Sequence, residues 1–166
     1  ADDVTAEHRL AMVRLAANGD PLLQVDTVEI ERGGTSYAID TVRQLQRAHP
    51  TVEFTFIIGT DSLLELHTWH DALDFVKLCR IVTIQRPGVL QRPVCHGDLN
   101  LPAGIAKRLV AAIVTTRQSG EASSEIRSRI AKGEPIGYLV PTLVEKYIVE
   151  HALYRKTTGG LPLGTR

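Results

Sequence analysis

Residues 52–58 form an almost unbroken run of apolar, β-branched and aromatic side chains, and Gly59-Thr60-Asp61-Ser62 follows it at once. A run of this kind is typical of a strand that is covered on both faces of a parallel sheet. Parallel strands need a crossover connection, which is usually a helix. The run therefore favours an α/β fold for the whole chain.

Helical and strand patterns alternate around this run. Because crossovers between parallel strands are nearly always right-handed, this order predicts one parallel sheet with helices on both faces. Ligands of such sheets bind at the carboxyl ends of the strands. The predicted helices are residues 5–17, 40–49, a segment from 63, 71–78, 105–112, 124–131 and 141–151; the predicted strands are 22–30, 52–58, 80–85 and 112–115, and 89–102 is a predicted loop.

The composition is that of an ordinary globular domain. The chain has 166 residues, of which 43% are hydrophobic and 23% charged, so we expect one domain over residues 1–156 and a flexible tail over 157–166. Nineteen basic and nineteen acidic side chains cancel, which leaves no diffuse positive field for a nucleic acid or an anionic membrane. Without a long apolar run or a visible secretory leader, we expect a cytoplasmic protein, with a homo-oligomer possible.

The cysteines and histidines give little reason to expect a metal. Cys79 and Cys95 form no CxxC pair, so we expect both to be reduced and structural. His67 and His70 are three residues apart and able to share a helix face, with Asp71 beside them. That spacing alone is weak evidence for zinc, and we assign no metal-ligating residue.

Short motifs follow two of the predicted strands. Gly59 lets backbone approach a ligand, and the carboxylate of Asp61 is able to accept hydrogen bonds from a ribose diol. The alternative is that Asp61 only caps the next helix. Arg86, in the turn after the next strand, brings a guanidinium to the same edge of the sheet, where it is able to bind phosphate. The alternative is that Arg86 is only part of the turn.

Two further features have both a binding and a structural interpretation. Ser123 and Ser124 at a predicted helix start, with Arg127 on its first turn, combine hydroxyls, free backbone N–H groups and a positive dipole end into an anion site. An ordinary serine cap beside a solvated arginine is the alternative. Trp69, the only tryptophan, either stacks on an aromatic ligand or fills the core.

Taken together and in order, these segments resemble the motifs of bacterial nicotinate-mononucleotide adenylyltransferases. No single motif is specific, but the ordered set spans nearly the whole chain. The resemblance implies a Rossmann-like nucleotidylyltransferase fold. It rests on Ser36-Tyr37-Ala38-Ile39-Asp40-Thr41, Phe56-Ile57-Ile58-Gly59-Thr60-Asp61-Ser62-Leu63, Trp69-His70, Arg86-Pro87-Gly88, Ser123-Ser124-Glu125-Ile126-Arg127, Tyr138-Leu139-Val140-Pro141 and His151-Ala152-Leu153-Tyr154.

The resemblance also implies roles for particular residues. The turn of Ser36, Tyr37 and Ala38 would enclose the nicotinate ring, and Trp69 would stack on it. Gly59 and Asp61 would hold the ribose and neighbouring backbone, while Ser123, Ser124, Arg127 and Arg86 would bind the phosphates of ATP. The implied reaction is in-line attack of the mononucleotide 5′-phosphate on the α-phosphorus of ATP, with Mg²⁺ shielding the departing pyrophosphate.

One part of the family pattern has no counterpart here. The family has an N-terminal strand with a glycine-rich turn and a histidine-x-glycine-histidine motif, and none of the six histidines of this chain has that context. We therefore assign no catalytic residue, expect that the chain is N-terminally incomplete, and expect negligible catalysis from it alone. In this architecture the missing first strand would lie beside residues 52–58, so its absence would expose an apolar strand edge.

Two alternatives remain open at this stage. One is another nucleotidylyltransferase of the same fold, such as a phosphopantetheine or cytidylyl enzyme, against which Trp69 and the Ser36-Tyr37 turn argue. The other is a non-catalytic nucleotide-binding relative that lacks the phosphate loop. The choice between acid and amide mononucleotide depends on backbone N–H groups whose direction the sequence does not give.

Overall fold

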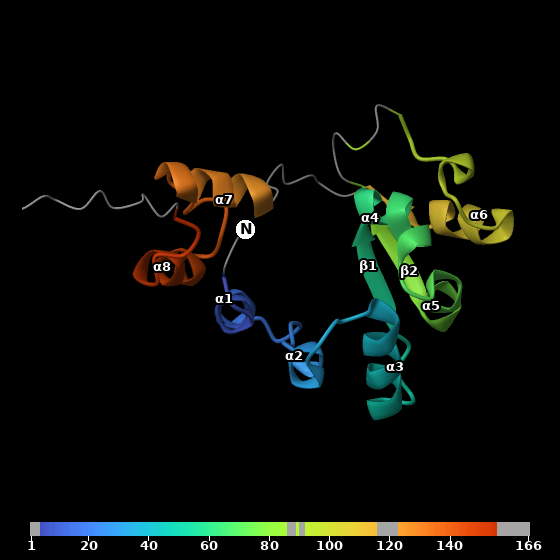
Figure 1. The fold of residues 1–166 in the computed structure, drawn as a ribbon, viewed down its shortest axis with the longest axis horizontal. Helices are drawn as coiled ribbons and strands as arrows, with labels where there is room; N and C mark the ends of the chain where they lie inside the picture. The colour runs from blue at the N-terminus through green and yellow to red at the C-terminus, as the bar shows by residue number, and fades with distance from the viewer. Residues whose placement is uncertain (1–3, 86–88, 90–91, 116–122, 156–166) are drawn as a thin grey trace, which may run out of the picture. The chain divides into compact units, whose positions relative to one another are not determined.

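The computed structural model describes residues 4–85, 89, 92–115 and 123–155. The chain divides into two compact units, one made of Ala1–Asp26 with Glu121–Arg166 and the other of Thr27–Gly120. We call them the terminal unit and the central unit and describe each by itself (Figure 1). The single domain expected over residues 1–156 stays a prediction, and the expected tail lies outside the described residues.

The central unit contains a three-stranded parallel sheet in the order β1-β2-β3. Its strands are β1 (Thr55–Gly59), β2 (Arg80–Ile84) and β3 (Ile113–Val114). Gly59 pairs with Ile84, which in turn pairs with Val114, so the carboxyl ends of all three strands lie at one edge. The parallel sheet and the α/β class confirm the prediction from the sequence.

Helices of the central unit pack on one face of this sheet. Because the strands follow each other in chain order, right-handed crossovers place α5 and α6 on the same side, and α3 packs against α5. Phe75 and Leu109 are buried there against Ile58 and Ile81. The helices are α2 (Val28–Arg32), α3 (Ala38–Ala48), α4 (Thr60–Glu65), α5 (Ala72–Leu78) and α6 (Ala103–Ala111), with the 3-10 turns η1 (Leu66–Thr68) and η2 (His96–Asp98).

The other face of β1 is open within the central unit. Side chains alternate between the faces of a strand, so Phe56 and Ile58 point toward the helices and Ile57 points away. Ile57 is 66% exposed, although the sequence predicted a strand covered on both faces. That prediction was wrong for this unit, because the crossover helices of a sheet in chain order all lie on one side.

The terminal unit is built from helices alone in its described part. It contains α1 (Ala6–Ala17), α7 (Ser123–Lys132) and α8 (Thr142–Glu150). Thr5 caps α1, because its hydroxyl accepts a hydrogen bond from the backbone N–H of His8. His8 also meets the Tyr147 hydroxyl of α8 at 2.9 Å, and Val144 and Ile148 of α8 are buried in the core of this unit. Within the described residues, no helix is long and apolar enough to cross a membrane.

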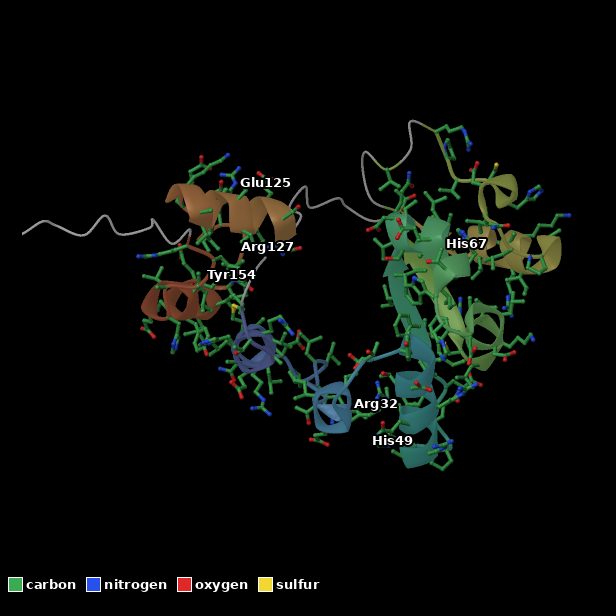
Figure 2. All side chains as sticks on the ribbon, in the orientation of Figure 1. Arg32, His49, His67, Glu125, Arg127 and Tyr154 are labelled. Atoms are coloured by element: carbon green, nitrogen blue, oxygen red, sulfur yellow. The ribbon has the colours of Figure 1, made fainter. Side chains whose placement is uncertain are left out.

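The predicted strand over residues 22–30 is wrong. Leu22 is 90% exposed in an irregular segment, and α2 follows it. A strand exists only where a neighbouring strand pairs with it, whereas α2 is held by side chains: Glu29 accepts a hydrogen bond from the Thr41 hydroxyl at 2.6 Å. Arg32 donates to the same hydroxyl at 3.0 Å and lies between α2 and α3 (Figure 2).

Candidate functional site

A cleft of about 320 Å³ opens at the carboxyl ends of the three strands of the central unit. Thr60 follows β1 and is 2% exposed, and its hydroxyl donates to the Ile84 carbonyl at 3.3 Å, which ties the ends of β1 and β2 together. Thr115 follows β3 and donates to the Gln85 side-chain oxygen at 2.9 Å. The lining residues are Thr60, Gln85, Arg92, Pro93, Val94, Val110, Ile113 and Thr115.

Gly59 and Asp61 lie at the same edge of the sheet. Gly59 is the last residue of β1 and the N-cap of α4. Because glycine has no side chain, no cap hydrogen bond comes from this position. Asp61 lies in the first turn of α4 and is exposed. The alternative that Asp61 is the cap of this helix is therefore wrong, because the cap position belongs to Gly59. A carboxylate in a first helical turn interacts favourably with the helix dipole.

Tyr37 and Trp69 are brought to one neighbourhood by His70. The Tyr37 ring stacks on the His70 ring with 4.2 Å between centroids and 28° between planes. Trp69 precedes His70 in the chain and is the C-cap of η1. Tyr37 is the N-cap of α3, with exposed Ser36 before it and Ala38 as the first helical residue. The two segments that the resemblance assigns to the nicotinate ring thus meet in the structure.

The Trp69 side chain packs against two phenylalanine rings. Its ring lies 6.2 Å from the Phe56 ring in an edge-to-face arrangement and 5.6 Å from the Phe75 ring. Trp69 is half-buried and packs against the hydrophobic core. Core packing and ligand stacking are thus compatible here, because a half-buried indole rests on the core and keeps part of its surface accessible.

Ser123, Ser124 and Arg127 lie on α7, in the terminal unit. The two serines are exposed in the first turn, and Arg127 follows Ser123 by four residues, which places both on one side of the helix. Figure 2 shows Glu125 and Arg127 leaving α7 on different sides, as a spacing of two residues requires. Arg86, the fourth residue expected at the phosphates, lies outside the described residues.

The sequence did not single out an ion pair beside the cleft. Arg92 gives one terminal nitrogen to each carboxylate oxygen of Asp98, at 2.7 and 2.6 Å, and the Cys95 backbone N–H donates to the same carboxylate at 2.8 Å. The hydrogen bond from Arg92 holds the pKa of Asp98 far below its ordinary range. The visible signal was the spacing of Cys95 and Asp98, which form a capping box at η2.

His67, His70 and Asp71, whose spacing was weak evidence for zinc, do not form the arrangement that this spacing suggested. His67 belongs to η1, which ends at Thr68, so His67 and His70 do not share a helix face. His67 contacts the Leu64 carbonyl through Nδ1 at 3.2 Å, while His70 is stacked on Tyr37 and lies 3.7 Å from Asp71. The described part of the chain holds no cluster of three or more histidine, cysteine or acidic side chains placed to bind a metal. Cys79 and Cys95 are both free thiols.

The chain is similar to a known protein family and to several curated proteins. Residues 3–129 match the family described as cytidylyltransferase-like. A probable nicotinate-nucleotide adenylyltransferase of Geotalea daltonii is 38% identical and is matched over 93% of this chain and 77% of its own length. Relatives of the same description from Herpetosiphon aurantiacus and Gemmatimonas aurantiaca are also 38% identical, and the chain spans 74% of each.

Solved structures show the same fold at lower sequence identity. The nicotinic acid mononucleotide adenylyltransferase of Plasmodium falciparum, complexed with NaAD, matches with a TM-score of 0.67 and 18% identity over 91% of this chain and 75% of that one. A putative nicotinate-nucleotide adenylyltransferase of Vibrio parahaemolyticus gives a TM-score of 0.64 at 17% identity, over 93% and 74%. The sequence identity and coverage of the curated relatives decide the family: the chain belongs to the nicotinate-nucleotide adenylyltransferases.

Proposed function

We propose that this chain provides the substrate sites for transfer of the adenylyl group of ATP to nicotinate mononucleotide, which yields nicotinate adenine dinucleotide and pyrophosphate. The observation that carries this proposal is the group of Tyr37, His70 and Trp69 beside the start of α3. A flat pyridine ring is a natural partner for a half-buried indole supported by other aromatic rings. The names of the curated relatives support the same substrate.

The position of Tyr37 favours the acid form of the mononucleotide. Tyr37 is the N-cap of α3, and Ala38 and Ile39 open the helix. Backbone N–H groups at a helix start have no intrahelical partner, and the dipole makes this end positive. A nicotinate carboxylate directed at these N–H groups is stabilised, whereas a neutral nicotinamide is not. We therefore infer that the acid binds more tightly than the amide.

ATP is assigned to the cleft at the strand ends of the central unit. Gln85 and Thr115 offer neutral hydrogen-bonding groups to a nucleoside, and Asp61 at the same edge suits a ribose diol. Ser123, Ser124 and Arg127 combine hydroxyls, a helix start and a cation, which is the chemistry that phosphate needs. The α7 residues are proposed as a phosphate-binding group of the terminal unit by itself.

The metal is proposed as Mg²⁺ that arrives with ATP. Mg²⁺ is usually held by substrate phosphates and water with only one or two carboxylates, so it needs no dedicated protein cage. A divalent ion at the phosphates would lower the charge of the leaving pyrophosphate. The cytoplasmic location and a homo-oligomer stay predictions from the sequence.

The chemistry asked of the protein is alignment. The 5′-phosphate of the mononucleotide attacks the α-phosphorus of ATP, a phosphorus–oxygen bond forms, and the bond to pyrophosphate breaks. A transfer of this kind depends mainly on positioning and charge neutralisation, so it needs no protein nucleophile. Trp69 and the start of α3 would fix the ring end of the mononucleotide, which accepts the adenylyl group. Arg127 and Mg²⁺ would neutralise the charge of the ATP phosphates.

Calorimetric titration of the chain with each substrate tests the proposal. Nicotinate mononucleotide and Mg²⁺-ATP should both bind. Trp69→Ala should remove binding of the mononucleotide and leave ATP unchanged, whereas Arg127→Gln should weaken ATP and leave the mononucleotide unchanged. A folded chain that binds neither substrate would contradict the proposal.

A further inference from the structure

Among the described residues that line the strand-end cleft, Arg92 is the charged one. It comes from the predicted loop over residues 89–102, which contains none of the motifs on which the family resemblance rests. We propose that Arg92 binds the phosphate chain of ATP at the rim of this cleft and that Asp98 is its positioning residue. This inference rests on the proposed function, because it takes ATP as the ligand of the cleft.

The guanidinium of Arg92 is fixed in orientation. Its two terminal nitrogens meet the two oxygens of Asp98 in a fork, and one of them also donates to the Pro93 carbonyl at 3.1 Å. Such paired contacts add geometric specificity as well as energy. Asp98 is itself held by the Cys95 backbone N–H at 2.8 Å. The arginine is therefore presented in a set position rather than on a freely rotating side chain.

The loop that carries the pair is anchored to the core. Leu99, next to Asp98, is 5% exposed and belongs to the core cluster of the central unit. Val94 and Leu101 pack against the same cluster. Val94 also lines the cleft, together with Pro93 and Arg92. Packing against the core therefore fixes the loop that forms this wall of the cleft.

The two partners of the ion pair differ in their access to a ligand. The Arg92 side chain is 56% exposed, whereas that of Asp98 is 16% exposed. An incoming phosphate oxygen can thus approach the cation while the carboxylate stays behind it. A guanidinium has five N–H donors, and the contacts of Arg92 to Asp98, to the Pro93 carbonyl and to the Cys95 sulfur at 3.9 Å involve both donors of one terminal nitrogen and one donor of the other. The two remaining donors leave capacity for a phosphate oxygen.

The alternative is that the Arg92–Asp98 ion pair only stabilises the conformation of the loop and contacts no ligand. Arg92 and Asp98 would then matter equally, and the loss of either would affect every ligand of the cleft alike. Direct contact with phosphate predicts a different pattern, because adenosine lacks the phosphates and the mononucleotide binds elsewhere. The test therefore compares ATP, adenosine and nicotinate mononucleotide on the same variants.

Calorimetric titration of the full chain with Mg²⁺-ATP gives the decisive numbers. Arg92→Gln should weaken ATP binding about tenfold, since a hydrogen bond to a charged group contributes about 1.5–3 kcal/mol and 1.4 kcal/mol is tenfold. Arg92→Lys should retain part of the affinity because the charge remains. Asp98→Asn should cost less than Arg92→Gln, because it releases the arginine without removing it. Adenosine and nicotinate mononucleotide should bind these variants as they bind the parent chain.

Lys77→Gln is the matched control. Lys77 is an exposed cation of the same unit, paired with Asp74 at 3.2 Å, and it precedes the amino end of β2. Removal of its charge should leave ATP binding unchanged. The proposal is overturned if Arg92→Gln behaves like Lys77→Gln, or if Arg92→Gln and Asp98→Asn weaken adenosine as much as ATP. If the parent chain does not bind ATP at all, the proposed function fails and Arg92 loses its ligand with it.

Discussion

Phe75 connects the stability of the central unit to its aromatic site. It is 1% exposed in α5, its ring lies 5.1 Å from the Phe56 ring in an edge-to-face arrangement, and it supports Trp69 at 5.6 Å. Phe75→Ala removes the ring and leaves a cavity, so we expect a loss of about 3–5 kcal/mol in the free energy of unfolding. Phe75→Leu retains most of the volume and should cost less than about 1.5 kcal/mol.

Urea unfolding followed by Trp69 fluorescence measures this loss in the unit that contains both residues. A domain has only about 5–15 kcal/mol of stability, so Phe75→Ala should shift the midpoint strongly. Leu73→Ala on the same helix is the control, because Leu73 is 45% exposed and its truncation should change stability by less than about 1 kcal/mol. If Phe75→Ala costs no more than Leu73→Ala, the described core is wrong.

Three shorter predictions follow from other parts of the structure. The pKa of Asp98 lies below its ordinary value of 3.8 because Arg92 donates a hydrogen bond to it. The stability that this pair contributes is therefore complete above pH 3.8 and is lost as pH falls toward the lowered pKa. Carboxyl NMR should show the lowered pKa, and the pKa should return toward 3.8 in Arg92→Gln. Cys95 is exposed, whereas burial raises the pKa of Cys79, so a thiol reagent near neutral pH should label Cys95 first, and a faster Cys79 would refute this. Ile57 is 66% exposed on β1, and the described pairing of β1 is with β2 alone, so the chain should self-associate. Ile57→Lys should reduce this self-association in sedimentation experiments. Equal association of the parent chain and the variant would contradict the edge-strand explanation.

The strands and helices with strong hydrophobic patterns were predictable. The run over residues 52–58 became β1 at Thr55–Gly59, and the helix expected over 40–49 is α3 at Ala38–Ala48. Both patterns arise because one side of each element must meet the core, and that requirement is written in the spacing of apolar residues. The helix expected over 124–131 is α7 at Ser123–Lys132, and Gly133 follows it with a φ of 73°, which suits glycine.

Features that depend on partners distant in the chain were not predictable. The segment over residues 22–30 alternates like a strand, but a strand needs a neighbour, and polar contacts of Glu29 with Thr41 accompany a helix instead. The stack of Tyr37 on His70 joins two elements that the sequence treats separately. The pair of Arg92 and Asp98 forms inside a loop whose composition gave no preferred structure.

The candidate site was predictable from the family resemblance more than from physical pattern alone. Pattern placed Gly59 and Asp61 at the carboxyl edge of the sheet, and the structure puts both there. Pattern left Trp69 between a core and a stacking role, and its half-buried position accommodates both. The ligand contacts of Ser36, Ala38 and the α7 residues stay predictions until binding is measured.

The most direct test of the account is tryptophan fluorescence during titration with nicotinate mononucleotide, because Trp69 is both the only tryptophan and the proposed stacking partner. We predict saturable quenching that is weaker with nicotinamide mononucleotide, since only the acid offers a carboxylate to the start of α3. Unchanged fluorescence from a chain that still unfolds cooperatively in urea would contradict the assignment of this site.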